Sequence, residues 1–212
     1  MRRGSLAAWL SEALDLNEIV LPKGYRDKAE ALQELQKVVR RCAKCELYKT
    51  RRNYVFGEGN PYADLMFVGE APGGEEDKHG RPFVGRAGKL LTELLSEIGL
   101  SRDEVYIANV LKCRPPRNRD PKPDEIKACS PYLDKQIKII QPRLLVALGR
   151  FAAFFLLNRS VTLSRSRLIV YGTRYGSKLI VTYHPAAVLR DPRKMDLVRE
   201  DFKLIKKTLE EA

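Results

Sequence analysis

Short apolar runs alternate with amphipathic segments over most of this chain. Five runs rich in leucine and β-branched residues have the length of strands and cover residues 64–69, 105–110, 143–148, 167–171 and 178–183. Between and after them, apolar residues recur every three or four positions, which predicts helices over 86–98, 124–140, 150–157 and 194–211. Buried strands that alternate with helices predict a three-layer α/β domain with a mostly parallel sheet.

Two further helical patterns precede this alternation. Residues 5–14 form a short amphipathic segment, and Pro22 and Gly24 separate it from a second one over 27–40. The whole chain has 212 residues, which suits one α/β domain with a small appendage.

Turns of glycine and proline follow two of the predicted strands. The strand at 64–69 ends at Gly69 and continues as Glu-Ala-Pro-Gly-Gly, and the strand at 178–183 runs into His184-Pro-Ala-Ala. At the carboxyl end of a parallel strand, such a turn lets a ligand approach the backbone closely. One turn alone would be an ordinary strand-to-helix connection. Two of them, each after an apolar strand, predict one shared ligand site.

Positive charge is unevenly distributed along the chain. The net charge is +12, although residues 1–40 carry seven basic and six acidic side chains. Basic residues gather in two groups, which are Lys112, Arg114, Arg117, Arg119 and Lys122 (the first basic group) and Arg159, Arg165, Arg167, Arg174 and Lys178 (the second basic group). Either group could be ordinary solvated surface, but two groups beside one predicted site favour a polyanion, and nucleic acid first, as the partner.

The sequence carries no sign of a membrane segment. No apolar run approaches the length of a membrane span, and the N-terminal Met1-Arg-Arg-Gly-Ser lacks the apolar core of a signal peptide. We expect a cytoplasmic monomer that makes no contact with a membrane. The charged content of 31% is also typical of proteins from thermophiles.

The four cysteines predict a metal centre. Cys42 and Cys45 form a Cys-x-x-Cys pair, whereas Cys113 and Cys129 come later in the chain. Disulfides are rare in cytosolic proteins, and free core cysteines would not require such a pair. Coordination by four thiolates remains, either of zinc or of an iron–sulfur cluster. The spacing matches no standard zinc ribbon, and the residues alone leave both possibilities open.

Taken together, these motifs carry a resemblance to a known family. Gly69-Glu-Ala-Pro-Gly, Phe83, Asn109, His184-Pro-Ala-Ala and the cysteines resemble, over residues 31–212, the family 4 uracil-DNA glycosylases, the iron–sulfur type of archaea and thermophilic bacteria. The resemblance implies a single domain over residues 31–212, with a four-stranded parallel sheet flanked by helices, and leaves residues 1–30 as an N-terminal extension. It implies hydrolysis of the N-glycosidic bond of deoxyuridine in DNA, which initiates base excision repair. It also implies a structural 4Fe–4S cluster on Cys42, Cys45, Cys113 and Cys129.

The resemblance assigns roles around a base that has been flipped out of DNA. Phe83 would stack on uracil, and the backbone after Gly69 and Ala71 would support its O2 atom. Asn109 would accept from N3–H and donate to O4, a pattern that cytosine reverses, so a fixed amide separates the two bases. His184 would donate to O2 as negative charge develops on the departing base. The second histidine, His79, lies in a charged loop and should face solvent.

Two positions in the first motif depart from the best-known uracil glycosylases. Ala71 stands where those enzymes carry an aspartate that orients water, and Gly73 stands where they carry a tyrosine that excludes thymine. We therefore expect Glu70 to serve both purposes. Glu76 and Asp77 are weaker candidates, because an acidic run at the start of a helix also complements the helix dipole.

The expected DNA contacts come from both basic groups and from the segment after His184. Arginines would neutralise phosphates, Tyr171 would stack on an exposed base, and residues 188–190 would fill the space left by the flipped base. These contacts are assigned to Arg114, Arg117, Arg119, Arg165, Arg167, Tyr171, Leu189 and Arg190.

Two other functions stay open. An iron–sulfur or zinc module that binds nucleic acid or transfers electrons would need the cysteines and the basic groups, but it would not need Phe83, Asn109 and His184 at the ends of one sheet. A related enzyme that traps the sugar on a loop histidine is disfavoured, because no histidine occurs between residues 80 and 183.

Overall fold

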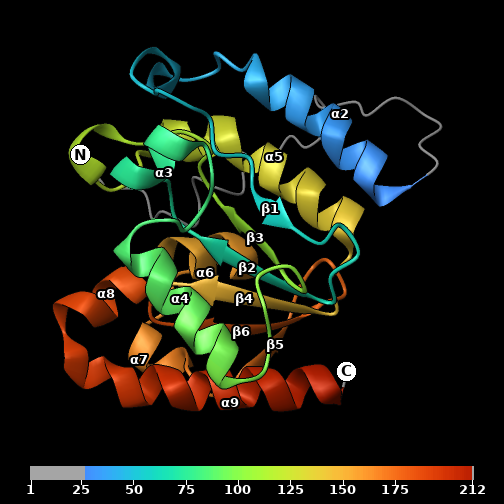
Figure 1. Cartoon of the computed structure of the whole chain (residues 1–212), viewed down its shortest axis with the longest axis vertical. Helices are drawn as coiled ribbons and strands as arrows, with labels where there is room; N and C mark the ends of the chain where they lie inside the picture. Colours follow the sequence, from blue (N-terminus) through green and yellow to red (C-terminus); the bar gives the residue numbers. More distant parts are fainter. Residues whose placement is uncertain (1–26, 212) are drawn as a thin grey trace.

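The computed structural model of the chain describes residues 27–211 (Figure 1). The helix predicted over residues 5–14 and most of the expected extension therefore lie outside the described residues. The first described helix, α2 (Lys28–Arg40), begins after Asp27, whose side chain accepts a hydrogen bond from the backbone N–H of Glu30. The expected boundary after residue 30 falls within this helix.

A six-stranded mixed sheet forms the middle layer, in the order β1-β3-β2-β4-β6-β5. Its four central strands are parallel, as predicted, and comprise β2 (Leu65–Gly69), β3 (Tyr106–Asn109), β4 (Leu144–Leu148) and β6 (Lys178–Thr182). Two short antiparallel strands, β1 (Glu58–Gly59) and β5 (Val170–Gly172), lie at the edges. The strand predicted over 167–171 begins only at Val170, because the left-handed backbone of Leu168 (φ 57°) interrupts it.

Helices cover both faces of the sheet and confirm the three-layer prediction (Figure 1). One face packs against α2, α5 (Pro123–Ile140) and α6 (Arg150–Leu157), and the other packs against α4 (Arg86–Glu97) and α9 (Met195–Glu210). The short helices are α3 (Gly74–His79), α7 (Leu163–Ser166), α8 (Pro185–Arg190) and the 3-10 turns Glu46–Lys49, Pro116–Asn118 and Pro192–Lys194. Between residues 27 and 211, no helix combines the length and the apolar character that crossing a membrane requires.

The central strands are buried on both faces, which explains their continuous apolar sequences. In β2, Met66 and Val68 point into the core beneath α2 and α5, whereas Leu65 and Phe67 point into the core beneath α4 and α9. Because the side chains of a strand alternate between its faces, two apolar cores require a strand without polar positions.

The four parallel strands bring their carboxyl ends to one edge of the sheet. Gly69 lies opposite Asn109 in the pairing of β2 with β3, and Leu148 lies opposite Thr182 in the pairing of β4 with β6. The turns that follow these strands, including Gly149 and His184, therefore meet at this edge, where open α/β sheets bind ligands.

Candidate active site and cysteine cavity

A cleft of about 620 Å³ opens at the carboxyl edge of the sheet. Five of the six residues expected to bind the base line this cleft, namely Glu70, Ala71, Phe83, Asn109 and His184. The sixth, Gly69, lies against two of them, because a Cβ atom at this position would stand 2.3 Å from Asn109 Oδ1 and 2.6 Å from Phe83 Cζ. The fold thus brings the predicted residues of both motifs together, and a glycine is required between two of them.

Asn109 presents a buried acceptor without a partner. Its side chain is 2% exposed, and its Oδ1 atom accepts no hydrogen bond from any residue that the structure describes. Its backbone carbonyl accepts from Lys112 Nζ at 2.8 Å, and the same ammonium group donates to Gln136 Oε1 at 2.6 Å. A buried acceptor left unpaired costs about 1–3 kcal/mol. The backbone at the end of β3 is therefore held by Lys112, while the side-chain Oδ1 atom of Asn109 can accept a hydrogen bond from a ligand.

Phe83 lies in a strained turn beside the second motif. Its φ angle is 51°, a left-handed conformation that is uncommon for an aromatic residue. Its ring stacks on the imidazole of His184 with 5.4 Å between the ring centroids and 28° between the planes. The two residues thus form one continuous aromatic wall of the cleft.

His184 is held as a neutral imidazole with a defined tautomer. Its Nδ1 atom accepts a hydrogen bond of 3.1 Å from the backbone N–H of Ala186, so the proton of the neutral ring lies on Nε2. Burial, aided by the nearby Arg190, lowers the pKa of His184 from 6.5 to about 4. Near neutral pH the side chain is therefore an uncharged N–H donor that lines the cleft.

Glu70 is the carboxylate of the cleft whose protonation is most altered. Burial and, to a smaller extent, the nearby Asp120 carboxylate raise its pKa from 4.5 to about 7, while Arg150 and Arg190 oppose the shift. Arg150 and Asp120 themselves form an ion pair at the cleft, and both remain well exposed. A carboxyl group with a pKa near 7 can exchange a proton at physiological pH.

The two weaker candidates for orienting water, Glu76 and Asp77, accept hydrogen bonds from backbone N–H groups. The carboxylate of Glu76 accepts from Gly73 N at 3.1 Å and from both Val84 N and Gly85 N at 2.9 Å, so it joins the turn after β2 to the turn that carries Phe83. Asp77 is 3% exposed and accepts from Arg52 N at 2.9 Å. The contacts of Glu76 were missed from the sequence, although the spacing from Gly73 to Glu76 is that of a capping box.

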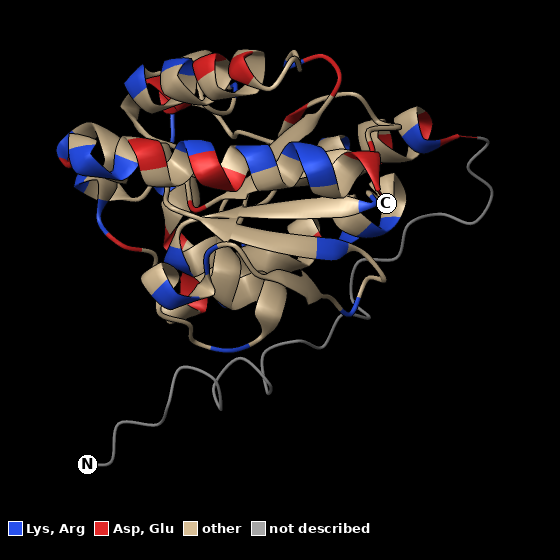
Figure 2. Cartoon of the chain, turned by 90° about the horizontal axis from the view of Figure 1, so that it is seen from below, with Lys and Arg blue, Asp and Glu red and all other residues tan. Residues whose placement is uncertain are grey.

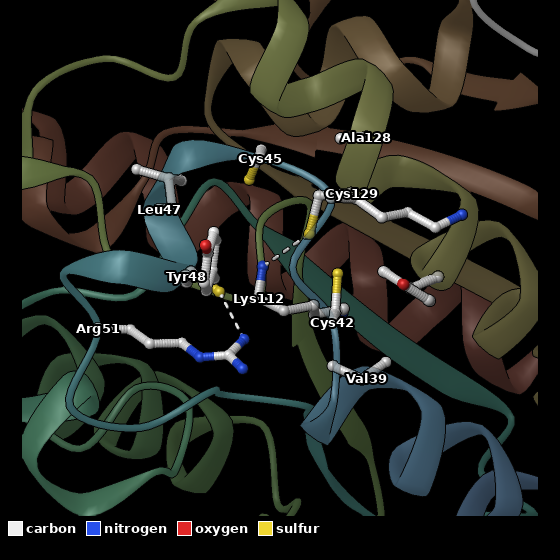
Figure 3. Close-up of a pocket in the computed structure, with 12 residues that line it drawn as sticks. Val39, Cys42, Cys45, Leu47, Tyr48, Arg51, Lys112, Ala128 and Cys129 are labelled. Atoms are coloured by element: carbon white, nitrogen blue, oxygen red, sulfur yellow. Dashed lines mark hydrogen bonds between the residues drawn. The ribbon is translucent and has the colours of Figure 1, made fainter.

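All four cysteines line one small cavity (Figure 3). It lies between the end of α2, the turn Glu46–Lys49, the segment after β3 and α5, and none of the cysteines forms a disulfide. Arg51 Nη1 donates to Cys113 Sγ at 3.2 Å, and Lys112 N donates to Cys129 Sγ at 3.1 Å. Burial raises the pKa of the thiols of Cys45, Cys113 and Cys129. As predicted, cysteines distant in the sequence converge.

The two basic groups include side chains that the fold uses internally. Arg114, Arg117, Arg165 and Arg190 are partly or fully exposed, whereas Arg119 forms a bidentate pair with Glu125. The expectation for Arg167 requires correction. Its side chain is only 8% exposed, and its Nε atom is 2.8 Å from a carboxylate oxygen of Asp201 in α9. Helix α9 carries both basic and acidic side chains along its length (Figure 2). Lys112, which is 1% exposed, likewise does not belong to the surface.

The segment after His184 divides between core and surface. Leu189 is 37% exposed and Arg190 is exposed, as a residue that enters DNA requires, whereas Val188 is 1% exposed and packs in the core. Tyr171 is half-buried, with the guanidinium of Arg159 5.7 Å from its ring centroid. His79 faces solvent, as predicted.

Comparison with known proteins agrees with this arrangement. The family model described as "Uracil DNA glycosylase superfamily" matches residues 56–211. A Type-4 uracil-DNA glycosylase from Sulfurisphaera tokodaii is 51% identical over 187 residues, which cover 84% of each chain. One from Archaeoglobus fulgidus is 51% identical over 83% of this chain and 92% of its own, and one from Thermotoga maritima is 48% identical over 77% and 86%. The resemblance found from the motifs is therefore confirmed, and the chain belongs to the type-4 family of the uracil-DNA glycosylase superfamily.

Proposed function

We propose that this chain excises uracil from DNA by hydrolysing the N-glycosidic bond of a flipped deoxyuridine, and so initiates base excision repair. The observation that carries the proposal is the buried Oδ1 atom of Asn109 at the wall of the cleft, which has no hydrogen-bond partner among residues 27–211. Uracil presents an N–H donor at N3, whereas cytosine presents an acceptor there. The type-4 relatives bear the name of the same activity.

Recognition of the base depends on two residues that line the cleft, Phe83 and Asn109. The ring of Phe83 offers an aromatic face, and stacking of a base on such a face contributes about 1–3 kcal/mol. Asn109 gives the directional contact, and the bond from Lys112 Nζ to its backbone carbonyl holds the end of the strand in place. A base without a donor at N3 would leave Oδ1 buried and unpaired, which penalises cytosine.

The departing base is stabilised by His184. When the glycosidic bond breaks, the bonding electrons move to the uracil ring and negative charge grows on O2. The Nε2–H group of a neutral imidazole can donate to that atom, and the bond from Ala186 N to Nδ1 keeps the ring in this tautomer. Since the donor is fixed before the reaction begins, it costs little reorganisation at the transition state.

Glu70 completes the proposed mechanism as the group that orients the attacking water. It lines the same cleft as His184 and Asn109. Its carboxylate form can accept a proton from water as the oxygen attacks C1′ of the sugar, and its negative charge favours the positive charge that develops there. The neutral acid can do neither.

The pH dependence of excision tests this role. Because the pKa of Glu70 is about 7, the carboxylate fraction falls tenfold for each pH unit below that value. We expect kcat/KM to rise with pH up to about 7 and then level off. The variant Glu70→Gln should lose this limb and fall by about 10²-fold at pH 8. His184 cannot cause the limb, because its pKa is about 4. An unchanged pH profile in Glu70→Gln would remove Glu70 from the mechanism.

Incubation with a defined oligonucleotide tests the activity itself. A strand with one uracil, treated with the protein and then with alkali, should break at that position. Matched strands with thymine or cytosine should stay intact. Tight binding to all three strands without any cleavage would instead support the alternative, a nucleic-acid-binding module without glycosylase activity.

The salt dependence of DNA affinity tests the exposed arginines. We infer that Arg114, Arg117, Arg165 and Arg190 contact phosphates, since their side chains are available at the surface. Neutralising each one should flatten the slope of log affinity against log salt by about one unit. Arg199→Gln is the matched control, because its guanidinium is paired with Glu97 and does not line the cleft, so its removal should leave the slope unchanged. Equal slopes in all variants would make this surface irrelevant to binding.

The cysteine cavity supports a 4Fe–4S cluster with a structural role. No group of three cysteine, histidine or acidic residues in the described part of the chain is placed to hold a metal ion. The proposal rests on the ligand set, four cysteines that line one cavity, and on the likeness to the type-4 enzymes, which favours a cluster over zinc. The N–H groups from Arg51 and Lys112 would stabilise the negative charge of ligating thiolates.

Anaerobically purified protein should therefore be brown and contain about four irons per chain. Cys129→Ala should lose iron and stability, because a buried ligand is removed. The neighbouring Ser130→Ala is the control and should keep its iron, since the hydroxyl of Ser130 has no hydrogen-bond partner in the described part of the chain. Stoichiometric zinc without visible absorbance in fresh protein would contradict the proposal.

We also infer that the protein acts as a monomer, with the glycosylase domain over residues 31–212 and an extension over residues 1–30. Both inferences rest on the sequence. Sedimentation velocity with and without a uracil-containing oligonucleotide checks the first. Excision by a chain that starts at residue 27, just before α2, checks whether the extension is needed for the chemistry.

A further inference from the structure

The turn that carries Phe83 is fastened from outside the cleft by Arg102. The guanidinium of Arg102 donates to the carbonyl of Pro82 at 2.8 Å and to the carbonyl of Phe83 at 3.1 Å. Arg102 does not line the base cleft. It lines a separate cavity of about 470 Å³, together with Glu58 and Arg81. One guanidinium group thus donates hydrogen bonds to two successive backbone carbonyls of the turn.

Glu58 orients this guanidinium. Its carboxylate accepts from Arg102 Nη2 and, on its other side, from Arg81 Nε at 2.8 Å. The side chains of Arg102 and Glu58 are 18% and 22% exposed, whereas that of Arg81 is 64% exposed. Glu58 lies in the edge strand β1, opposite Ile107 of β3. The edge strand therefore ties the guanidinium to the central sheet.

The turn needs such restraint because its backbone is strained. Phe83 has a φ angle of 51°, and the left-handed region is unfavourable for a non-glycine residue. The next two N–H groups, of Val84 and Gly85, are held by the carboxylate of Glu76. The carbonyl of Phe83 packs against Gly88, where a Cβ atom would lie 1.8 Å from the carbonyl oxygen. The carbonyls before and at Phe83 are therefore held by Arg102, and the amides after it by Glu76.

We propose that Arg102, oriented by Glu58, is a positioning residue that holds the ring of Phe83 where the flipped base stacks. The proposal rests on the stacking role of Phe83 proposed above. Without the guanidinium, two carbonyls lose their charged donor and the left-handed turn can relax to ordinary backbone. The ring would then leave its place beside His184, although the cleft, Asn109 and His184 would remain.

The first experiment compares Arg102→Ala with Arg81→Ala. Both variants remove an arginine from Glu58, but only the guanidinium of Arg102 donates to the carbonyls of Pro82 and Phe83. We expect Arg102→Ala to lower kcat/KM for uracil excision about tenfold and to weaken inhibition by free uracil to a similar degree, as partial loss of a stacking contact implies. Arg81→Ala should stay within about twofold of the parent. Arg102→Lys, which keeps the charge and one or two donors, should recover part of the activity.

A double-mutant cycle with Phe83→Ala separates positioning from general stability. If Arg102 acts through the ring, Arg102→Ala should have little further effect on excision once the ring is absent, whereas an effect on the folded state would add. Thermal unfolding of each variant, measured beside the activity, gives the second readout. Additive losses in the cycle, or full activity of Arg102→Ala, would overturn the positioning role. Full activity of Phe83→Ala would instead overturn the stacking role on which it rests.

Discussion

Replacing Asn109 by aspartate should lower uracil excision by at least about 10²-fold and create weak activity on cytosine. The substitution preserves the shape of the side chain but removes its only donor. An ionised carboxylate would place a second acceptor against O4 of uracil. The same carboxylate can accept from the N4 amino group of cytosine and, if protonated, can donate to N3. The new activity should be easiest to detect opposite a mismatch, where flipping the base costs less.

A second asparagine provides the control for added negative charge. Asn118 also lines the cleft, and its Oδ1 atom accepts from Arg114 Nε at 2.7 Å, a bond that an aspartate would keep. Asn118→Asp should therefore leave the choice of base unchanged. Single-turnover excision from strands with uracil or mismatched cytosine measures both variants. If Asn109→Asp kept full uracil activity, Asn109 would not be the reader of the base.

Removal of the imidazole should have a comparable effect on rate but none on selectivity. We expect His184→Ala to reduce the single-turnover rate by about 10²–10³-fold, the range found when one fixed donor to a developing negative charge is lost. Cytosine should remain uncleaved because Asn109 still selects the base, and thymine should remain uncleaved because Glu70, the residue expected to exclude it, is unchanged. His79→Ala is the matched control, since His79 lies at the surface and does not line the cleft.

A leaving group whose anion is more stable should reduce the rate loss that His184→Ala causes. With 5-fluorouracil in place of uracil, the departing anion is more stable, and the loss caused by His184→Ala should shrink. The loss caused by Asn109→Asp should not shrink in the same way, because its origin lies in recognition. Equal losses on both substrates in His184→Ala would mean that the imidazole holds the base rather than stabilises its charge.

The central strands and the meeting of the two motifs could be predicted from the sequence because each depends on local chemistry. Continuous apolar runs require strands buried on both faces, and parallel strands bring their carboxyl ends to one edge. Gly69, Phe83, Asn109 and His184 follow from these two facts and from the resemblance. The edge strand β1 could not be predicted, since two residues carry no periodic pattern.

Charged residues were harder to place because their partners are distant in the sequence. Arg167 was expected at the surface, but it is paired with Asp201 of the last helix. The residues near Arg167 in the sequence do not indicate that partner. Arg102 was not singled out at all, since its contacts to Pro82, Phe83 and Glu58 form only when three separate segments fold together. The bonds of Glu76 to Val84 and Gly85 arise in the same way.

The order of the strands also determines when the sheet can form during synthesis. Strand β2 lies between β3 and β4, and its Leu65 pairs with Leu144, a position that the ribosome delivers much later. Until β4 emerges, the nascent chain presents Leu-Met-Phe-Val with one backbone edge unpaired and one apolar face incompletely covered. Such an edge invites pairing with other chains. A chain interrupted before Leu144 should therefore aggregate, and one that reaches the end of α9, which covers the second face of the sheet, should not.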